Sequence, residues 1–155
     1  PHVTVPISWL PYIGNTWRTG HDIGSSYESM FSDLMLNNAW ANVGGPGAWN
    51  DADMLEVGNA GLSLEEARSH FALWCLIKSP LLIGSDLMKL SKDFLEILKN
   101  TELIAISQDA LGHQGRLVSA QAGPTGYQLP PFEAMPELSG ERYSLYKSYL
   151  RESFQ

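Results

Sequence analysis

Cysteine is nearly absent from this sequence: one occurs among 155 residues, which excludes an internal disulfide. That residue, Cys75, falls with His70 on the apolar stripe of a predicted helix. Both are therefore expected to be core side chains, the thiol as a small hydrophobic group and not as a reactive nucleophile.

Basic residues are also few. Ten Lys and Arg stand against 17 Asp and Glu, giving a net charge of −7, and the basic residues are scattered along the chain. Binding to nucleic acid or to an anionic membrane requires clustered cations. We therefore expect neither partner, whereas a neutral ligand such as a sugar is compatible with this charge pattern.

Long hydrophobic runs are missing as well. The most apolar stretch, residues 73–83, is interrupted by Lys78 and Pro80 and is too short to span a bilayer. The chain begins with Pro1 in place of Met, so the absence of a targeting segment carries no information. With 44% hydrophobic and 17% charged residues, the composition is that of a globular protein.

Four helices are predicted from apolar periodicity and capping signals. A Ser followed three residues later by Glu, the pattern of a capping box, occurs at Ser25 and at Ser63 just before apolar stripes. Two shorter apolar stretches predict helices that begin after Ser91 and Thr101.

Three short strand-like segments precede these helices, at residues 13–19, 48–50 and 81–83. Each is followed by an aspartate, and these aspartates, Asp22, Asp53 and Asp86, are 31 and 33 residues apart. A barrel of eight strand–helix units uses about 31 residues per unit, and its active site lies on the loops after the strands. The spacing predicts an α/β fold with successive units of a (β/α)8 TIM barrel.

A doubly wound parallel sheet is the main alternative, because it is built from similar units. Such a sheet usually carries a glycine-rich phosphate loop after a strand. The glycine-rich run at 44–47 comes before its strand, so it predicts a turn.

Two clusters could carry chemistry at the predicted strand ends. In the first, Arg18 is followed by Asp22, either as a structural pair at a helix start or as a carboxyl acid or base beside a cation that holds substrate hydroxyls. In the second, Trp49 and Asn50 adjoin Asp51 and Asp53, a set suited to a sugar ring. A divalent metal on the two aspartates competes with that interpretation, but no His or Cys cluster completes a site, and we expect no metal and no cofactor.

Several stretches, taken in order, resemble the melibiase-type α-galactosidases, glycoside hydrolase family 27. Residues 17–23 read Trp-Arg-Thr-Gly-His-Asp-Ile where the family has Trp-Arg-Thr-Thr-x-Asp-Ile, and residues 45–55 follow its Gly-Pro-Gly-Gly-Trp-Asn-Asp-Pro-Asp-Met-Leu motif. Residues 68–71, 81–86 and 104–115 match too, so the resemblance covers residues 14–118.

The resemblance implies a fold, a reaction and site residues. The family has a (β/α)8 barrel, of which residues 1–118 would supply the later part, about units six to eight. The implied activity is hydrolysis of terminal α-linked galactose from oligosaccharides, glycolipids or glycoproteins, with retention through two carboxylates. Asp22 aligns with the acid/base residue. The aligned substrate-binding and loop-shaping residues are Arg18, Asp53, Met54, Trp49 and Asp51.

The nucleophilic aspartate of the family has no counterpart in these residues, and we expect it upstream of Pro1. The loop that distinguishes galactose from N-acetylgalactosamine is also expected upstream, so α-N-acetylgalactosaminidase activity is an alternative. A second hypothesis is a non-catalytic, vestigial galactose-binding half-barrel, which would be unstable alone or would pair with another copy. A secretory, vacuolar or lysosomal location is implied by the resemblance alone.

The sequence departs from the family pattern at four motif positions and in its tail. Gly20 replaces Thr, Ala52 and Ala110 replace Pro, and Ser107 replaces Asn. Residues 119–155 do not resemble the family's sandwich domain and predict a Pro- and Gly-rich linker, with a possible amphipathic helix over 141–154.

Overall fold

The computed structural model describes residues 9–118. Two short strands, β1 (Thr16–Arg18) and β2 (Trp49–Asp51), pair in parallel, with Trp17 opposite Asn50. Side chains alternate across the pair. Trp17 and Asn50 are buried, whereas the residues on either side of them face the opposite side and are half-buried or exposed. The two strands therefore have one covered face.

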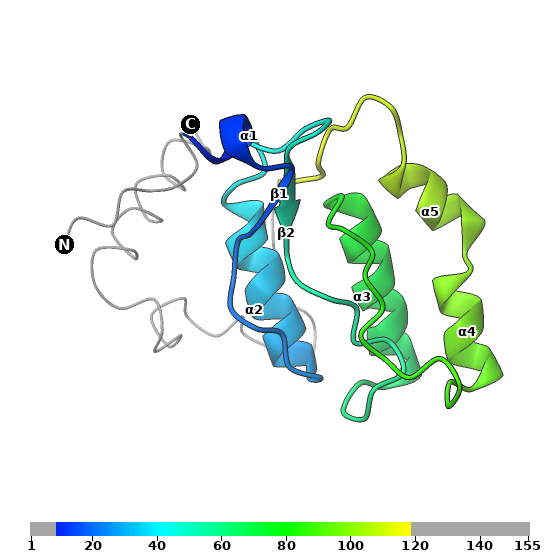
Figure 1. Cartoon of the computed structure of the whole chain (residues 1–155). Coiled ribbons are helices and arrows are strands. Elements are labelled where there is room, and N and C mark those ends of the chain that lie inside the picture. The colour runs from blue at the N-terminus through cyan, green and yellow to red at the C-terminus, as the bar shows by residue number, and fades with distance from the viewer. Residues whose placement is uncertain (1–8, 119–155) are drawn as a thin grey trace. The chain divides into compact units, whose positions relative to one another are not determined.

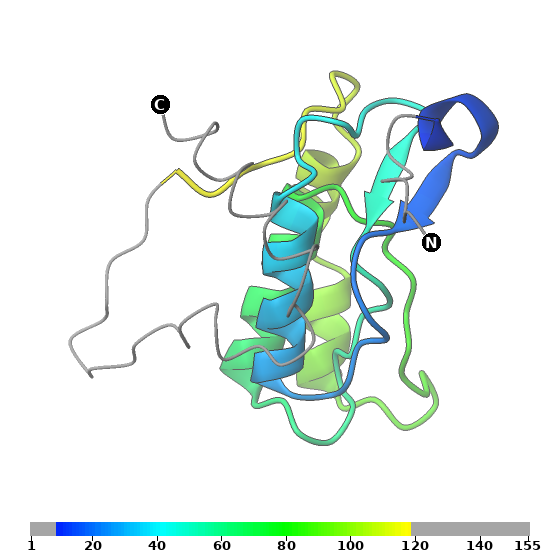
Figure 2. The same cartoon turned by 90° about the vertical axis from the view of Figure 1, so that its left-hand side faces the viewer.

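Two longer helices provide that cover. Helix α2 (Tyr27–Asn38) connects the strands, and helix α3 (Leu64–Leu76) follows β2. The view in Figure 1 and the perpendicular view in Figure 2 place both helices on the same side of the strands. This strand–helix–strand–helix order, with parallel strands and helices on one face, is the arrangement expected of consecutive barrel units.

The hydrophobic core lies around helix α3, which packs against α2, α4 (Lys92–Leu98) and α5 (Thr101–Ser107), and it includes side chains of the segment that follows β2. The ring of Trp74 is completely buried and contacts the imidazole of His70 edge-on, with 4.1 Å between ring centroids. The buried apolar residues are Met30, Leu34, Ala52, Leu55, Val57, Ala67, Phe71, Trp74, Cys75, Ile77, Ile97 and Leu98.

The predicted burial of His70 and Cys75 is confirmed, since both are inaccessible to solvent. Burial raises the pKa of the Cys75 thiol to about 11, which keeps it in its unreactive protonated form. Burial lowers the pKa of His70 to about 4, and its neutral Nε2 accepts a hydrogen bond from the Glu56 amide at 3.0 Å.

The helix predictions are confirmed, with a one-residue shift at two of the starts. Helix α5 begins at Thr101 and not after it, with Asn100 as its N-cap. The other shift is at the start of α2. Its N-cap is Ser26, whose hydroxyl accepts from the Ser29 amide, and not Ser25, whose hydroxyl donates instead to the Ala60 carbonyl. At α3 the predicted capping box is present, with Ser63 and Glu66 each accepting from the other's backbone amide.

The strand predictions are partly wrong. Residues 13–19 were expected to be extended, but a short helix, α1 (Leu10–Ile13), takes in the first of them, and β1 begins at Thr16. The third predicted strand, 81–83, is reduced to a parallel bridge between Leu55 and Ile83. Among the described residues no further strand flanks this segment to extend the ladder.

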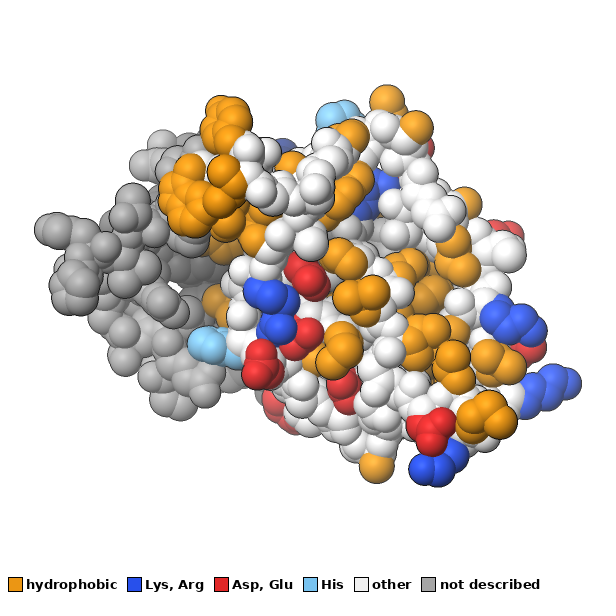
Figure 3. Space-filling model, in the orientation of Figure 1, with side chains coloured by type: hydrophobic (Ala, Val, Ile, Leu, Met, Phe, Trp, Pro, Cys, Tyr) orange, Lys and Arg blue, Asp and Glu red, His pale blue; other side chains and the backbone are white. Residues whose placement is uncertain are grey.

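The face of the strands that points away from α2 and α3 carries apolar groups in the open. Figure 3 shows hydrophobic side chains on this face next to a group of acidic and basic ones. Met54, Leu82 and Ile83 are between 43% and 56% exposed. In a complete barrel this side of the strands is the packed interior.

Among residues 9–118, no helix is long and apolar enough to cross a membrane. The predicted linker at 119–155, with its amphipathic helix over 141–154, lies outside the described residues, and that division of the chain stays a prediction.

Candidate active site

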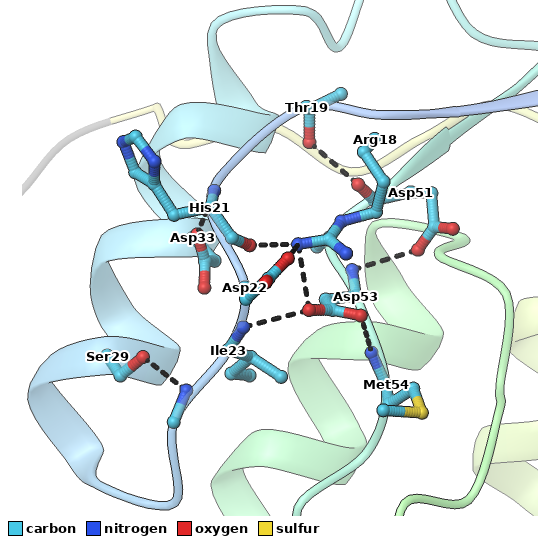
Figure 4. A network of polar contacts seen from close by, with 12 residues as sticks. Arg18, Thr19, His21, Asp22, Ile23, Ser29, Asp33, Asp51, Asp53 and Met54 are labelled. Atoms are coloured by element: carbon cyan, nitrogen blue, oxygen red, sulfur yellow. Dashed lines mark hydrogen bonds and ion pairs between the residues drawn. The ribbon is translucent and has the colours of Figure 1, made fainter.

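Arg18 is the centre of a polar network at the carboxyl ends of the two strands (Figure 4). Its Nη2 atom lies 2.8 Å from Oδ2 of Asp53 and 3.4 Å from Oδ1 of Asp22. The same nitrogen also donates to the main-chain carbonyl of His21. One guanidinium therefore joins the loop after β1 to the loop after β2.

The Asp53 carboxylate is fully engaged. Besides Arg18, its Oδ2 accepts from the Ile23 amide at 2.8 Å, and its Oδ1 accepts from the Met54 amide at 2.9 Å. Only 11% of its side chain is exposed. The backbone at Asp53 is left-handed, with φ of +80°, and its carbonyl accepts from the buried Trp74 indole at 2.8 Å. A non-glycine residue adopts that conformation only when its surroundings fix it.

Asp51 supports this turn from the end of β2. Its Oδ1 accepts from the Asp53 amide at 2.8 Å, and its carbonyl accepts from both the amide and the hydroxyl of Thr19, at 2.9 and 3.0 Å. Burial raises the pKa of the Asp51 carboxyl, and the nearby Arg18 cation acts in the opposite direction.

Asp22 differs from both of these aspartates. Its side chain is fully exposed, and its 3.4 Å separation from Arg18 is longer than the 2.7–2.9 Å typical of a charge-assisted hydrogen bond. Figure 4 shows it on the loop after β1, between the Arg18 guanidinium and the Ile23 backbone. Its carboxylate is therefore accessible to a ligand.

Comparison with known proteins identifies the family. The melibiase family model, described as alpha galactosidase A, matches residues 2–109. The chain belongs to the melibiase family. An α-galactosidase from Oryza sativa subsp. japonica is 50% identical over 118 residues, which are 76% of this chain and 28% of that protein. The chain thus spans less than a third of the curated relatives it matches.

Solved structures of the melibiase family agree with this assignment. A putative α-galactosidase/melibiase from Bacteroides fragilis matches with a TM-score of 0.72 and 36% identity, over 75% of this chain and 28% of that one. An α-galactosidase from Saccharomyces cerevisiae, solved with raffinose, matches with a TM-score of 0.71 and 26% identity, over 79% of this chain and 33% of that one. These relatives are TIM-barrel enzymes, matched over part of the barrel.

The predicted site residues of this melibiase chain fall into two groups. Arg18, Asp22, Asp51 and Asp53 form the network described above, and Met54 joins it through its backbone while 43% of the residue is exposed. Trp49 opens β2, two residues before Asp51, and its half-buried side chain lies at the start of the strand. A role for Trp49 at the sugar stays a prediction.

Sequence reasoning missed a chain of hydrogen-bonded amide side chains beneath the strands, in which Asn37 and Asn50 are buried and Gln114 is half-buried. Asn50 Oδ1 accepts from the Trp17 indole at 3.0 Å, and Asn50 Nδ2 donates to Gln114 Oε1 at 2.9 Å. Gln114 then donates to Asn37 Oδ1 at 2.5 Å, and Asn37 donates to the Thr19 hydroxyl at 3.0 Å. These bonds tie both strands to α2 and to the segment after α5.

Asp33 was missed as well. It is a buried residue of α2, and its Oδ1 accepts from the His21 amide at 3.1 Å. Burial raises the pKa of Asp33 to about 6. One signal was available: Asp33 and Asn37 are polar residues one helical turn apart, beside the apolar stripe of Met30 and Leu34.

The alternative of a divalent metal concerned Asp51 and Asp53. Among residues 9–118, no group of three or more His, Cys, Asp or Glu side chains is placed to hold a metal ion. The two aspartates considered for a metal are occupied otherwise, Asp53 by Arg18 and two amides, and Asp51 by the Asp53 amide.

Proposed function

We propose that this chain supplies the acid/base half of the active site of a retaining α-galactosidase. Asp22 protonates the glycosidic oxygen as the galactosyl bond breaks, and the resulting carboxylate then activates the water that releases galactose. The accessible Asp22 carboxylate at the carboxyl end of β1 is the observation that carries this proposal.

The contrast among the three aspartates supports that assignment. A general acid must give its proton to the substrate, so its carboxyl has to be free to approach the leaving oxygen. Asp53 uses both oxygens on Arg18 and two backbone amides, and Asp51 supports the turn at Asp53. Asp22 alone of the three presents a carboxylate that the protein does not engage closely.

Arg18 and Asp53 would form a rigid polar surface that binds the hydroxyl groups of the substrate. Arg18 is 36% exposed at its side chain and keeps guanidinium nitrogens beyond the one bound to Asp53, so it can donate to sugar hydroxyls. Met54 offers an exposed apolar surface beside it, and Asp51 shapes the end of β2. By family resemblance Trp49, at the start of the same strand, helps to shape the sugar-binding loop.

Retaining chemistry also requires a nucleophilic carboxylate about 5–5.5 Å from the acid. Because Asp51 and Asp53 are engaged in the turn, we infer that the nucleophile comes from outside residues 9–118. The open apolar strand face supports the same inference, since it suits contact with the other units of a barrel. By family resemblance the chain supplies about units six to eight.

The test starts from the native polypeptide, captured from its source with an antibody to residues 9–118 and weighed by mass spectrometry. A mass well above 17.1 kDa together with hydrolysis of α-galactosides supports the proposal. Asp22→Asn should then remove nearly all turnover, while Asp93→Asn, at an exposed aspartate of α4, should leave it unchanged. Full turnover in the Asp22 variant would exclude the assigned acid/base role.

The alternatives give different results in the same assay. A mass of 17.1 kDa with galactose-induced NMR shifts and no hydrolysis would indicate a non-catalytic sugar-binding protein. Faster cleavage of the α-N-acetylgalactosaminide than of the α-galactoside would indicate the related specificity. By family resemblance we also propose an extracellular, vacuolar or lysosomal location, which fractionation of the source cells would test.

A further inference from the structure

The loop that carries Asp22 is held at three backbone atoms by three different side chains. Arg18 donates to the His21 carbonyl, and Asp53 accepts from the Ile23 amide at 2.8 Å. The third contact is made from α2, where Asp33 accepts from the His21 amide at 3.1 Å. Both peptide groups next to Asp22 are therefore fixed, and Figure 4 shows the three supports around it.

Gly20 makes the third contact possible. A Cβ atom at Gly20 would lie 2.3 Å from Asp33 Oδ1, too close for two heavy atoms that are not bonded, and 3.2 Å from Asp33 Cγ, so the carboxylate would have to move. The family motif has Thr at this position, and the side chain of a Thr would displace the carboxylate from the His21 amide. The contact between the Asp33 carboxylate and the His21 amide therefore depends on having glycine at position 20.

We propose that Asp33 is a positioning residue for the acid/base Asp22, and that Gly20 provides the space for its carboxylate. This inference rests on the proposed function. Asp33 is a buried residue of α2, and it acts on Asp22 through the backbone, by holding the His21 amide one residue before it. A displacement of about 1 Å at a catalytic group can lower the rate on the order of 100-fold.

The electrostatics around Asp33 fit this role. Burial raises its pKa to about 6, so it is mostly ionised at neutral pH. The charged groups that act on it are His21 and Arg18, which favour the ionised form, and Asp53, which opposes it. An ionised carboxylate is the stronger acceptor for a backbone N–H.

Four variants of the native polypeptide test the inference: Gly20→Ala, Asp33→Ala, Asp33→Asn and the double variant Gly20→Ala/Asp33→Ala. The measured quantity is kcat/KM for two substrates, methyl α-galactoside and dinitrophenyl α-galactoside. Methanol leaves only with a proton from the acid, whereas dinitrophenolate leaves without one. A misplaced acid therefore affects the first substrate selectively, which general loss of structure would not do.

We expect Gly20→Ala and Asp33→Ala each to lower kcat/KM for the methyl galactoside on the order of 100-fold, with little change for the dinitrophenyl galactoside. The double variant should be no worse than Asp33→Ala, because the new Cβ has room once the carboxylate is gone. Asp33→Asn keeps an acceptor and should remain close to the parent protein. Gly24→Ala is the matched control, since its Cβ would meet Ser29 Oγ at an ordinary 3.6 Å.

Hydrogen exchange at the His21 amide, with the unfolding midpoint of each variant, provides a readout independent of turnover. Exchange should accelerate in Gly20→Ala and in Asp33→Ala and stay slow in Asp33→Asn. Equal losses on both substrates, multiplicative effects in the double variant, or parent-like kinetics in Gly20→Ala would overturn the inference while leaving the proposed function intact. Failure of the parent protein to cleave either galactoside would overturn both.

Discussion

The Nη2 atom of Arg18 lies 2.8 Å from Oδ2 of Asp53, so an ion pair joins the carboxyl ends of two adjacent parallel strands. Asp53 is largely buried and Arg18 is about one third exposed, and the same guanidinium reaches the His21 carbonyl and Asp22. Hydrogen bonds of this charge-assisted kind fix direction as well as distance. The two loops of the site consequently form one unit.

Replacing Arg18 by Lys should break the hydrogen bonds that join the loop after β1 to the loop after β2. Lysine has a single ammonium in place of the planar fork, so it cannot hold Asp53 and the His21 carbonyl in the same geometry. We expect a loss of about 1–3 kcal/mol in the free energy of unfolding, measured as a shift in urea midpoint, with a lower kcat/KM. Arg68→Lys, at an exposed pair 3.6 Å from Glu65, should change the stability by less than about 0.5 kcal/mol. Equal losses in the free energy of unfolding of the two variants would show that the Arg18 network stabilises the protein no more than an exposed ion pair does.

The left-handed backbone at Asp53 predicts an unusual order of stability between two substitutions. Gly and Ala both remove the carboxylate, but only Ala keeps a Cβ at φ of +80°. That Cβ costs roughly 1–2 kcal/mol, which exceeds the roughly 0.5–1 kcal/mol that glycine costs in the unfolded chain. Asp53→Gly should therefore unfold at the same or a higher urea concentration than Asp53→Ala. At Asp51, which lies in β2, the order should be reversed, so that the Ala variant unfolds at a higher urea concentration than the Gly variant. A more stable Ala variant at both positions would show that the left-handed backbone at Asp53 does not penalise a Cβ atom.

The helix caps offer a comparison between two serines in equivalent positions. Ser63 begins α3 and takes part in a reciprocal capping box with Glu66, whereas Ser91 begins α4 without a side-chain cap bond. Ser63→Ala should cost about 1 kcal/mol in the free energy of unfolding. Ser91→Ala should cost only a few tenths, about the scale of a neutral surface change. Thermal unfolding of both variants measures the difference, and equal losses would mean that the cap bond is not the cause.

Local signals accounted for much of the fold. The apolar stripes and the Ser63–Glu66 pair predicted the helices, because capping and amphipathicity depend on residues within one or two turns. The start of α2 was predicted one residue early, at Ser25, since adjacent serines offer the same cap and only the tertiary contact of Ser25 with Ala60 separates them. The strand at 81–83 needs neighbouring strands, so its sequence alone could not fix its extent.

The site was predictable only where motif order revealed it. Arg18, Asp22 and Asp53 were named from strand ends and family resemblance, and the structure brings them together. Asp33 and Gln114 were not, because their partners lie outside their own local segments: His21 precedes Asp33 by 12 residues, and Gln114 and Asn37 are 77 residues apart. Hydrophobic periodicity predicts which face of a helix or strand a residue occupies, but it does not predict which polar atom the side chain contacts there.

The buried side chains of Asp33 and His70 have opposite pKa shifts, so they make the free energy of unfolding depend on pH in opposite directions. Burial raises the pKa of Asp33 from 3.8 to about 6, so the stability that Asp33 contributes as a neutral acid is present below pH 3.8 and is lost as pH rises through 6. Burial lowers the pKa of His70 from 6.5 to about 4, so its contribution is present above pH 6.5 and is lost as pH falls through 4. Each shift corresponds to about 3 kcal/mol, and the two oppose each other between pH 4 and pH 6.

Asp33→Asn removes one of the two opposing groups and leaves the other. The urea midpoint of the parent polypeptide should vary little between pH 4 and pH 6 on account of these residues, because the gain at His70 offsets the loss at Asp33. In the Asn variant only His70 titrates, so stability should rise steadily with pH over this range. Relative to the parent, the variant should gain up to about 3 kcal/mol between pH 4 and pH 7. Asp93→Asn, at an exposed aspartate, should run parallel to the parent, and an Asp33 variant that did the same would show that the Asp33 carboxyl titrates alike in the folded and unfolded states.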